Sequence, residues 1–364
     1  MRAALVRLAA QLAPDRRLAV CDFRPLCNAE RVILRGTISD PAFRARALDA
    51  AAAVAGVEEV DDWLLLLPTA DLAAWAWFVP RVVAADLWRR PGAPAAERVD
   101  QALLGTPLRP LRTEGEWVQV QAPDGYLGWA LRAELAPLDP AAARLWEQEP
   151  WVHLAAPAEL RREVGAPVLA YAGTALPLLE RRGEWLALRW PGSGAAVVPA
   201  ADCRVLRDMP HPLRPGRDNG SGAAPMPSPA ALAALATRLA GTPYAGGGAT
   251  PAGFDAGGLI RYLFAYHGVA LPRDPDQQWA ASHPLGPEDD PLPADLLFFG
   301  APGRTDPVAV ALYLGDGRCV CVREGGVEVV SFHPGDPAFD PTLAAAALGY
   351  RRVLPPQGLW GEGI

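Results

Sequence analysis

The sequence predicts a multidomain α+β protein: a small N-terminal α/β module, two consecutive β-barrels and a C-terminal domain that combines helices with a sheet. Three observations support this prediction. The chain has 364 residues, and at ~150 residues per domain this gives two to four domains. The tripeptide Gly-Glu-Trp recurs at Gly115 and Gly183, within two stretches rich in short strands, which indicates an internal repeat. The last third of the chain combines a helical run with strands separated by glycine-rich turns.

The first stretch, residues 1–70, has the pattern of a small α/β module. The expected elements are a helix over 2–12, strands over 18–20 and 31–36, a helix over 41–54 capped by Asp40, and a strand over 63–67. With V-x-L-x-G before the second helix and G-V-x-x-V after it, the stretch resembles a BON-like module. Such modules are associated with binding; a dimerisation domain is an equal interpretation.

Short strands and turn signals fill residues 79–138 and, more loosely, residues 150–206. The alternation in Trp117–Val120 and the Asp-Gly turn at Asp124 indicate antiparallel hairpins. The run E-x-x-x-Q-A-L-L-G, followed by D-G-Y-x-G-W, resembles the bacterial SH3-like domain found ahead of NlpC/P60 domains in murein-peptide-recycling enzymes. The Gly-Glu-Trp repeat predicts two such barrels in tandem. The Pro-, Gly- and Ser-rich residues 207–227 are expected to form a linker.

Residues 228–353 are expected to form the last domain, and its loop 241–258 carries the most informative motif. Asp255 precedes an apolar run with helical spacing and is placed to cap that helix. This loop, together with G-x-x-L-P-R from Gly268 and D-L-L-F-F from Asp295, resembles the NlpC/P60 family of cysteine peptidases. The resemblance implies a papain-like fold for the domain.

The resemblance also locates the three residues that carry the family's chemistry. Members have an Asp-Cys-Ser-Gly run with the nucleophile at a helix start, where the helix dipole favours thiolate. Here the run reads Asp255-Ala256-Gly257-Gly258, so the nucleophile position is Ala256. The base position falls on Ala309 and the orienting position on Cys321. Because the chemistry needs a thiolate, an imidazole and an orienting group, we expect an inactive homologue that is not an enzyme.

A ligand site is a further implication of the resemblance. Recycling-type members bind the free amino end of a murein peptide through a Glu, a Tyr and the Asp beside the nucleophile, which correspond to Glu97, Tyr126 and Asp255. Together with Gly257 they form the predicted ligand-binding set, for a peptide such as L-Ala-γ-D-Glu-diamino acid or for a partner protein. Two alternatives stay open: an active γ-D-glutamyl-L-diamino acid endopeptidase with a displaced nucleophile, and a non-catalytic assembly or scaffold protein.

The amino-acid composition limits which partners and which cellular compartment are expected. A formal net charge of −7 argues against binding to nucleic acid or to an anionic membrane surface. No apolar run reaches the ~18 residues of a membrane span. The cysteine content does not indicate a disulfide framework, and Cys319-x-Cys321 lacks a histidine at metal-site spacing. We therefore expect no cofactor, no metal and a reduced, cytoplasmic location, and leave open whether the chain forms a homo-oligomer or binds a protein partner.

Overall fold

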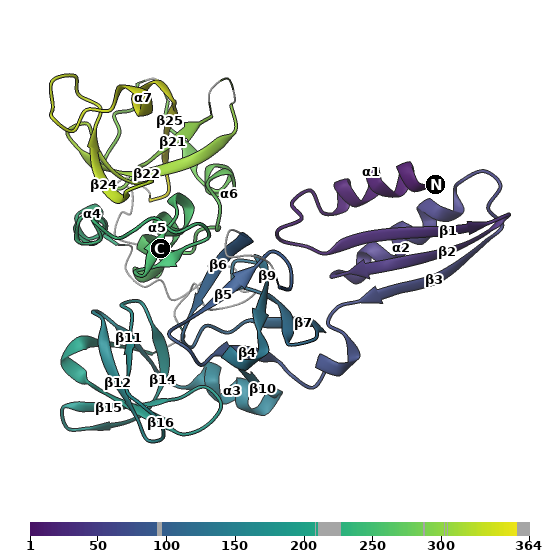
Figure 1. The fold of residues 1–364 in the computed structure, drawn as a ribbon, viewed down its shortest axis with the longest axis horizontal. Coiled ribbons are helices and arrows are strands. Elements are labelled where there is room, and N and C mark those ends of the chain that lie inside the picture. The colour runs from purple at the N-terminus through teal and green to yellow at the C-terminus, as the bar shows by residue number, and fades with distance from the viewer. Residues whose placement is uncertain are drawn as a thin grey trace, which may run out of the picture.

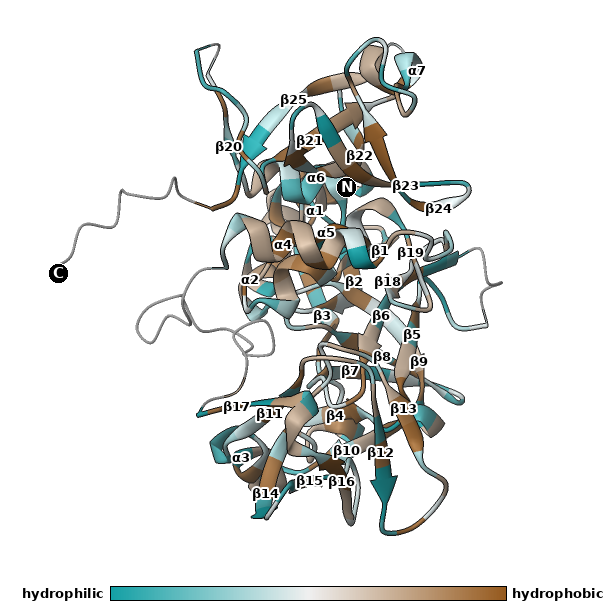
Figure 2. Ribbon diagram, turned by 90° about the vertical axis from the view of Figure 1, so that its left-hand side faces the viewer, coloured by the Kyte–Doolittle hydropathy of each residue, from teal (hydrophilic) through white to brown (hydrophobic). Residues whose placement is uncertain are grey.

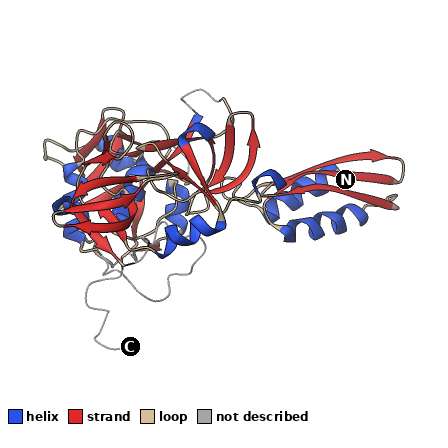
Figure 3. Cartoon of the chain, turned by 90° about the horizontal axis from the view of Figure 1, so that it is seen from below, coloured by secondary structure: helices blue, strands red, loops and turns tan. Residues whose placement is uncertain are grey.

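A computed structural model describes residues 1–92, 97–207, 209, 227–286, 288–301, 303 and 305–354. Within these residues the chain forms an α/β module, two mainly β domains and a final α+β domain (Figure 1). The N-terminal module projects away from the other three parts, which pack against one another (Figure 1 and Figure 3). The expected linker over 207–227 lies almost entirely outside the described residues.

The N-terminal module packs two helices on one face of a three-stranded sheet (Figure 3). Its elements are α1 (Arg2–Leu12), β1 (Cys21–Asn28), β2 (Arg31–Ile38), α2 (Pro41–Ala52) and β3 (Glu59–Leu66). β1 and β2 pair antiparallel, whereas β2 and β3 pair parallel across the α2 connection. Asp40 caps α2 as predicted, because its carboxylate accepts a hydrogen bond from the Ala42 amide at 2.8 Å. The strand expected over 18–20 is wrong; β1 begins at Cys21.

Alternation along the strands decides which face of this module is covered. Leu34 of β2 and Leu64 of β3 are buried against Leu5 of α1. Trp63 and Leu65 flank Leu64 in β3, point to the other face and are 58% and 47% exposed. The sheet therefore has one packed face and one open face.

The first β domain is built on a five-stranded sheet in the order β6-β5-β9-β8-β7, with a separate β4–β10 pair. Leu87, Leu108 and Val118 fill its core. Its elements are η1 (Ala70–Leu72), β4 (Trp77–Pro80), β5 (Ala84–Trp88), β6 (Arg98–Leu103), β7 (Arg109–Glu114), β8 (Trp117–Gln121), β9 (Leu127–Leu131), η3 (Arg132–Glu134) and β10 (Leu135–Leu138).

The second β domain has a seven-stranded sheet in the order β13-β12-β16-β15-β14-β11-β17. A helix that the sequence analysis missed, α3, precedes it and packs Trp146 against Trp151, with ring centroids 6.0 Å apart. Its elements are α3 (Pro140–Gln148), β11 (Trp151–Leu154), β12 (Ala158–Arg162), β13 (Val168–Ala170), β14 (Ala175–Arg182), β15 (Trp185–Arg189), β16 (Ala195–Pro199), η4 (Ala200–Asp202) and β17 (Cys203–Leu206).

The repeated Gly-Glu-Trp tripeptides occupy equivalent hairpins. Glu114 pairs with Trp117 across one turn and Arg182 with Trp185 across the other. Gly115 and Gly183 both have positive φ, +58° and +62°, which the first position of a tight two-residue hairpin requires. The internal repeat therefore has a structural counterpart.

The final domain packs helices on one face of a six-stranded sheet in the order β20-β25-β21-β22-β23-β24. Leu259 and Leu263 of α5 meet Val310 and Leu312 of β22 in the main core, and Figure 2 shows hydrophobic residues along β22. The elements are α4 (Pro229–Arg238), β18 (Ala249–Thr250), β19 (Gly253–Phe254), α5 (Ala256–Tyr266), α6 (Pro275–Ala280), β20 (His283–Pro284), β21 (Leu296–Gly300), β22 (Pro307–Gly315), β23 (Arg318–Arg323), β24 (Gly326–Ser331), α7 (Pro341–Ala345) and β25 (Ala347–Arg352). No described helix has the length and apolar character needed to cross a membrane.

Gly36 provides a test of the packing in the N-terminal module. Its φ is +140°, and a Cβ there would lie 1.9 Å from the Asp22 carbonyl oxygen. Gly36→Ala is expected to lower the free energy of unfolding by about 2–3 kcal/mol, because the strands must separate to admit the methyl group. Gly56→Ala is the control, since its φ is +83° with no atom within 4 Å, and should cost about 1 kcal/mol. Equal losses in chemical denaturation would contradict the steric argument.

Candidate functional site

The candidate site begins at the first turn of α5, where the backbone is closely packed. α5 starts at Ala256, and Asp255 is its N-cap, as predicted. The Asp255 carboxylate accepts hydrogen bonds from the Gly258 amide at 2.8 Å and from the Gly247 amide at 3.0 Å. A Cβ on Gly258 would lie 2.0 Å from the Gly248 carbonyl oxygen. The glycines therefore allow the loop and the helix start to touch.

Gly257 is buried, and its role as a ligand-binding residue stays a prediction. A Cβ at this position would lie 2.5 Å from the Arg273 carbonyl oxygen. Gln278 Nε2 also donates a hydrogen bond to the Gly257 carbonyl oxygen at 3.0 Å. Gly257 is thus a close-packed position between α5 and the segment that leads into α6.

The three positions predicted to correspond to the family triad, Ala256, Ala309 and Cys321, lie on α5, β22 and β23. Leu312 pairs with Val320, which makes Ala309 and Cys321 diagonal neighbours on one face of the sheet, as the alternation predicts. That face forms a second apolar cluster, which includes Cys321 and is flanked by Ala309. Ala256 packs instead at the edge of the main core, beside the rest of α5.

The two cysteines of β23 are buried thiols. Cys319 and Cys321 are 0% and 4% exposed. Burial raises the pKa of Cys321 to about 12 and also raises the pKa of Cys319. Within the described residues, no histidine is hydrogen-bonded to a cysteine, and no group of three or more side chains is arranged to hold a metal ion. A protonated, buried thiol is a poor nucleophile.

A buried arginine joins the first β domain to the final domain. Arg273 is 1% exposed; its Nε donates to Asp100 of β6 at 3.0 Å, and its two terminal nitrogens donate to Asp255 at 2.8 and 2.7 Å. Burial lowers the pKa of Arg273, but the Asp255 and Asp100 carboxylates more than compensate and hold it above its ordinary value. Arg261 of α5 also donates to Asp100 and to Asp124, at 2.8 Å each. The two guanidinium groups and three carboxylates form one network.

Tyr126 extends this network toward the N-terminal module. Its hydroxyl donates to Asp274 at 2.9 Å, and burial together with the Asp274 charge raises the pKa of the phenol. Arg17, in the segment between α1 and β1, donates to the same Asp274 oxygen at 2.8 Å and to both oxygens of Asp276 at 2.9 and 2.6 Å. Asp15 accepts from Gln277 at 2.6 Å. The N-terminal segment is therefore docked on α6.

Glu97 makes none of the hydrogen bonds of this network, and its role in ligand binding beside Tyr126 and Asp255 stays a prediction. It pairs with Arg90 at 2.5 Å. Asp100, three residues later, is the acidic residue of the first β domain that binds Arg273 and Arg261. Because Asp100 is 1% exposed while Glu97 remains solvent-accessible, the buried position in the strand is the one that reaches the final domain.

The residues that the sequence analysis missed are Asp100, Gln101, Arg261, Arg273 and Arg17. One signal was available: Asp100 and Gln101 interrupt an apolar strand between Val99 and Ala102. Gln101 accepts from the Ala249 amide and from the Thr250 hydroxyl, both at 3.0 Å, so it binds the loop ahead of α5. A polar residue in a buried strand needs a partner, and here the partner lies in another domain.

Comparison with known proteins identifies the domains. Residues 241–336 match the NlpC/P60 family and residues 89–135 match the bacterial dipeptidyl-peptidase SH3 domain. The chain contains an NlpC/P60 domain preceded by a bacterial SH3 domain, which confirms the resemblance seen in the motifs. The relation of the N-terminal module to BON domains stays a prediction.

Two relatives from Bacillus subtilis (strain 168) are similar to part of this chain. One is a gamma-DL-glutamyl hydrolase, 34% identical over 99 residues, which are 27% of this chain and 24% of that protein. The other is the bifunctional muramidase/DL-endopeptidase CwlT, 33% identical over 102 residues, which are 28% of this chain and 31% of that protein. The matches thus cover about a quarter to a third of each relative.

A solved structure extends the likeness in fold to most of the chain. The crystal structure of an NlpC/P60 family protein from Bacillus cereus ATCC 10987 has a TM-score of 0.66 and 22% sequence identity. The match covers 77% of this chain and 100% of that one. At this level of identity the likeness shows the fold.

The prediction that the chain is not an enzyme is wrong. The relatives are named as a hydrolase and as an endopeptidase, so the comparisons point to a peptidase. That prediction rested only on the side chains at Ala256, Ala309 and Cys321. A narrower chemical statement holds: a methyl group at Ala256 is no nucleophile, so a hydrolysis by this chain uses another attacking group.

The buried network makes a prediction about stability. Arg273→Met leaves the carboxylates of Asp100 and Asp255 without their shared cation, and is expected to cost about 3–5 kcal/mol of unfolding free energy. Arg318→Met is the control, because Arg318 pairs with Asp336 at 2.9 Å while 56% exposed, and should cost less than about 1 kcal/mol. Similar losses for both variants in chemical denaturation would contradict the role given to Arg273.

Proposed function

We propose that this chain binds the free amino end of a cell-wall peptide of the L-Ala-γ-D-Glu-diamino acid class, between its SH3 domain and its NlpC/P60 domain. The observation that carries the proposal is the group formed by Tyr126, Asp274 and Asp276, which already holds one cation, the Arg17 guanidinium. A peptide ammonium needs the same partners, namely carboxylates and a hydroxyl. The names of the relatives supply the peptide class.

Asp255 has a different part from the one first expected. Its two oxygens are held by Arg273 and by two backbone amides, so it has no free oxygen pair for an amine. Asp274 is more accessible, with 22% of its side chain exposed. We therefore place the ammonium at Asp274 and give Asp255 the task of positioning Arg273 and the start of α5.

Arg17 competes with the peptide in this proposal. Its side chain is 30% exposed, and those of its partners Asp274 and Asp276 are 22% and 46% exposed. Ion pairs of this exposure stabilise by about 1 kcal/mol or less each. An incoming ammonium can therefore displace the Arg17 side chain from Asp274 at small cost, while the main chain of the segment stays bound to the SH3 domain.

Hydrolysis of the bound peptide is the second candidate function. The names of the relatives favour it, and Cys321 is the thiol that occupies one of the three predicted triad positions. The pKa of about 12 for this thiol argues against its acting as the attacking group at neutral pH.

The predictions of self-association, of a protein partner and of a cytoplasmic location have weaker support than peptide binding. The open face of the β1–β3 sheet, with Trp63 and Leu65 exposed, supports the prediction of self-association or of a protein partner. The five free cysteines are consistent with the predicted cytoplasmic location, which stays a prediction.

Calorimetric titration tests the amine site. A free-amine L-Ala-γ-D-Glu-diamino acid peptide is expected to bind, and Arg17→Ala should strengthen binding about five-fold, because the competing cation is gone and an exposed pair contributes about 1 kcal/mol. Arg31→Ala is the matched control: Arg31 pairs with Asp61 in the same module, and its loss should change nothing. Equal binding of the N-acetylated peptide, or no heat with either protein, would refute the site.

Mass detection of peptide fragments tests the second candidate. Any cleavage is expected to persist in Cys321→Ser at the wild-type rate, because the thiol is buried and protonated at neutral pH. Cys319→Ser, at the neighbouring buried thiol, controls for a loss of folding. Cleavage that is lost in Cys321→Ser and kept in Cys319→Ser would instead identify Cys321 as the nucleophile.

A further inference from the structure

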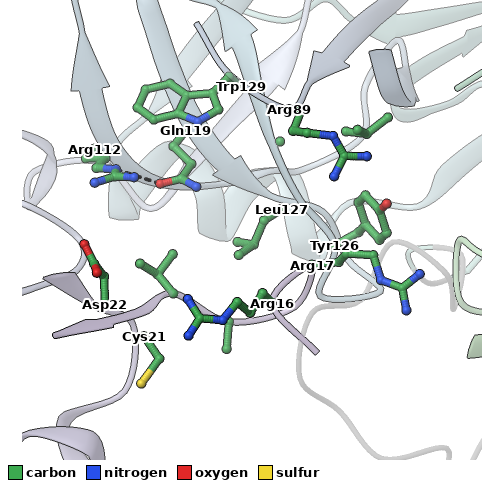
Figure 4. A pocket seen from close by; sticks show the side chains of 14 residues that line it. Arg16, Arg17, Cys21, Asp22, Arg89, Arg112, Gln119, Tyr126, Leu127 and Trp129 are labelled. Atoms are coloured by element: carbon green, nitrogen blue, oxygen red, sulfur yellow. Dashed lines mark hydrogen bonds between the residues drawn. The ribbon is translucent and has the colours of Figure 1, made fainter. Parts of the chain in front are cut away.

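A cavity of about 270 Å³ lies between the N-terminal segment and the SH3 domain. Residues from Arg16 to Asp22 form one wall, and β7, β8 and β9 contribute to the other (Figure 4). The walls are tied together by the main chain: the Leu127 amide donates to the Arg17 carbonyl oxygen at 2.7 Å. Gln121 Nε2 donates to the Leu18 carbonyl oxygen at 3.0 Å. The cavity is therefore part of a fixed contact between two domains.

Positive charge dominates the lining of this cavity. Arg16, Arg89 and Arg112 all line it, and within the described part of the chain none of the three forms an ion pair. Asp22 is the carboxylate of the lining, and it pairs with Arg24 at 2.7 Å. The fourth arginine, Arg17, is neutralised by Asp15, Asp274 and Asp276. Three arginines without an ion pair among the described residues thus line one cavity, from different sides (Figure 4), in a protein whose net charge is −7.

Arg112 is the most constrained of these arginines. Its Nε donates to Gln119 at 2.7 Å, and its guanidinium carbon lies 5.2 Å from the centroid of the Trp129 ring. Its terminal nitrogens make no hydrogen bond within the described residues. Burial lowers the pKa of this guanidinium, which nevertheless stays charged because its ordinary pKa is above ~12. A half-buried cation with free donors is stabilised by an anion.

The size and surface of the cavity restrict the ligand. About 270 Å³ is close to the lower end of the volumes of small-molecule sites, roughly 300–1,000 Å³, so a polymer does not fit. Trp129 supplies an aromatic surface on the SH3-domain side of the cavity. The lining therefore suits a small molecule with an anionic group at one end and an apolar or planar part at the other.

We propose that this cavity binds a small organic oxyanion, either a carboxylate or a phosphate monoester, with its charge between Arg89 and Arg112 and its apolar part against Trp129. Arginine forks bind both groups through paired hydrogen bonds. The proposal does not rest on peptide binding at Asp274, since the two sites have opposite charge and the cavity is formed by the SH3 domain and the N-terminal segment.

Calorimetric titration of the full chain with benzoate, phenyl phosphate, inorganic phosphate and neutral benzyl alcohol tests this site. At least one of the two aromatic anions is expected to bind, benzyl alcohol is not, and added salt should weaken the binding. The benzoate and phenyl phosphate arms distinguish the carboxylate from the phosphate monoester, and inorganic phosphate measures the contribution of the aromatic part.

Two variants and one control assign the binding to the cavity. Arg89→Gln and Arg112→Gln should each weaken it about ten-fold, the loss of one charge-assisted hydrogen bond. Arg89 is exposed, so its variant remains informative if Arg112→Gln unfolds. Arg161→Gln is the matched control, because Arg161 also stacks on a tryptophan, Trp185 at 5.4 Å, but pairs with Glu159 outside the cavity. No binding of either aromatic anion at physiological salt, or binding unchanged by Arg89→Gln, would overturn the proposal.

Discussion

The arrangement of the SH3 domain on the NlpC/P60 domain depends on the buried cation of Arg273. A guanidinium with 1% exposure must recover the free energy of its lost hydration, and it does so with one carboxylate from each domain, Asp100 and Asp255. Because both carboxylates are needed, the two domains cannot separate without leaving charges unpaired. The same pairing fixes Asp255, which caps α5, so the domain interface and the candidate site are stabilised by one interaction.

The start of α5 is the place where the resemblance to NlpC/P60 peptidases predicts the nucleophile, and its backbone is set by local contacts. The N-cap, the close contact of Gly248 with Gly258 and the burial of Gly257 depend on the fold and not on the side chain at position 256. A methyl group can therefore stand at Ala256 with no disturbance of the loop. Backbone geometry and reactive chemistry are separable here: the fold is kept by capping and close packing, whereas catalysis needs particular atoms.

Local sequence signals predicted local structure well and long-range contacts poorly. The cap at Asp255 and the hairpins at Gly115 and Gly183 follow from interactions between residues a few positions apart. The choice of Asp100 over Glu97 as the interface carboxylate depends on Arg273, which is 173 residues away in sequence. Which of two acidic residues, Glu97 just before β6 or Asp100 within it, is buried is decided by the partner domain, and no local pattern contains that information.

The N-terminal module was predicted as a separate binding or assembly unit, and its contacts give it a closer relation to the site. A short segment, Asp15–Asp22, contributes Arg17 to the acidic group on α6 and Arg16 to the cationic cavity on the SH3 domain. The segment has its own carboxylate, Asp15, which binds Arg17 at 2.8 Å and orients it. The Leu127 and Gln121 hydrogen bonds hold the main chain of this segment on the SH3 domain, so Arg17 can leave Asp274 by a movement of its side chain alone. Coupling between the two proposed sites needs a movement of that main chain. If a ligand at one site moves it, thermodynamic linkage requires each ligand to change the affinity for the other by the same factor.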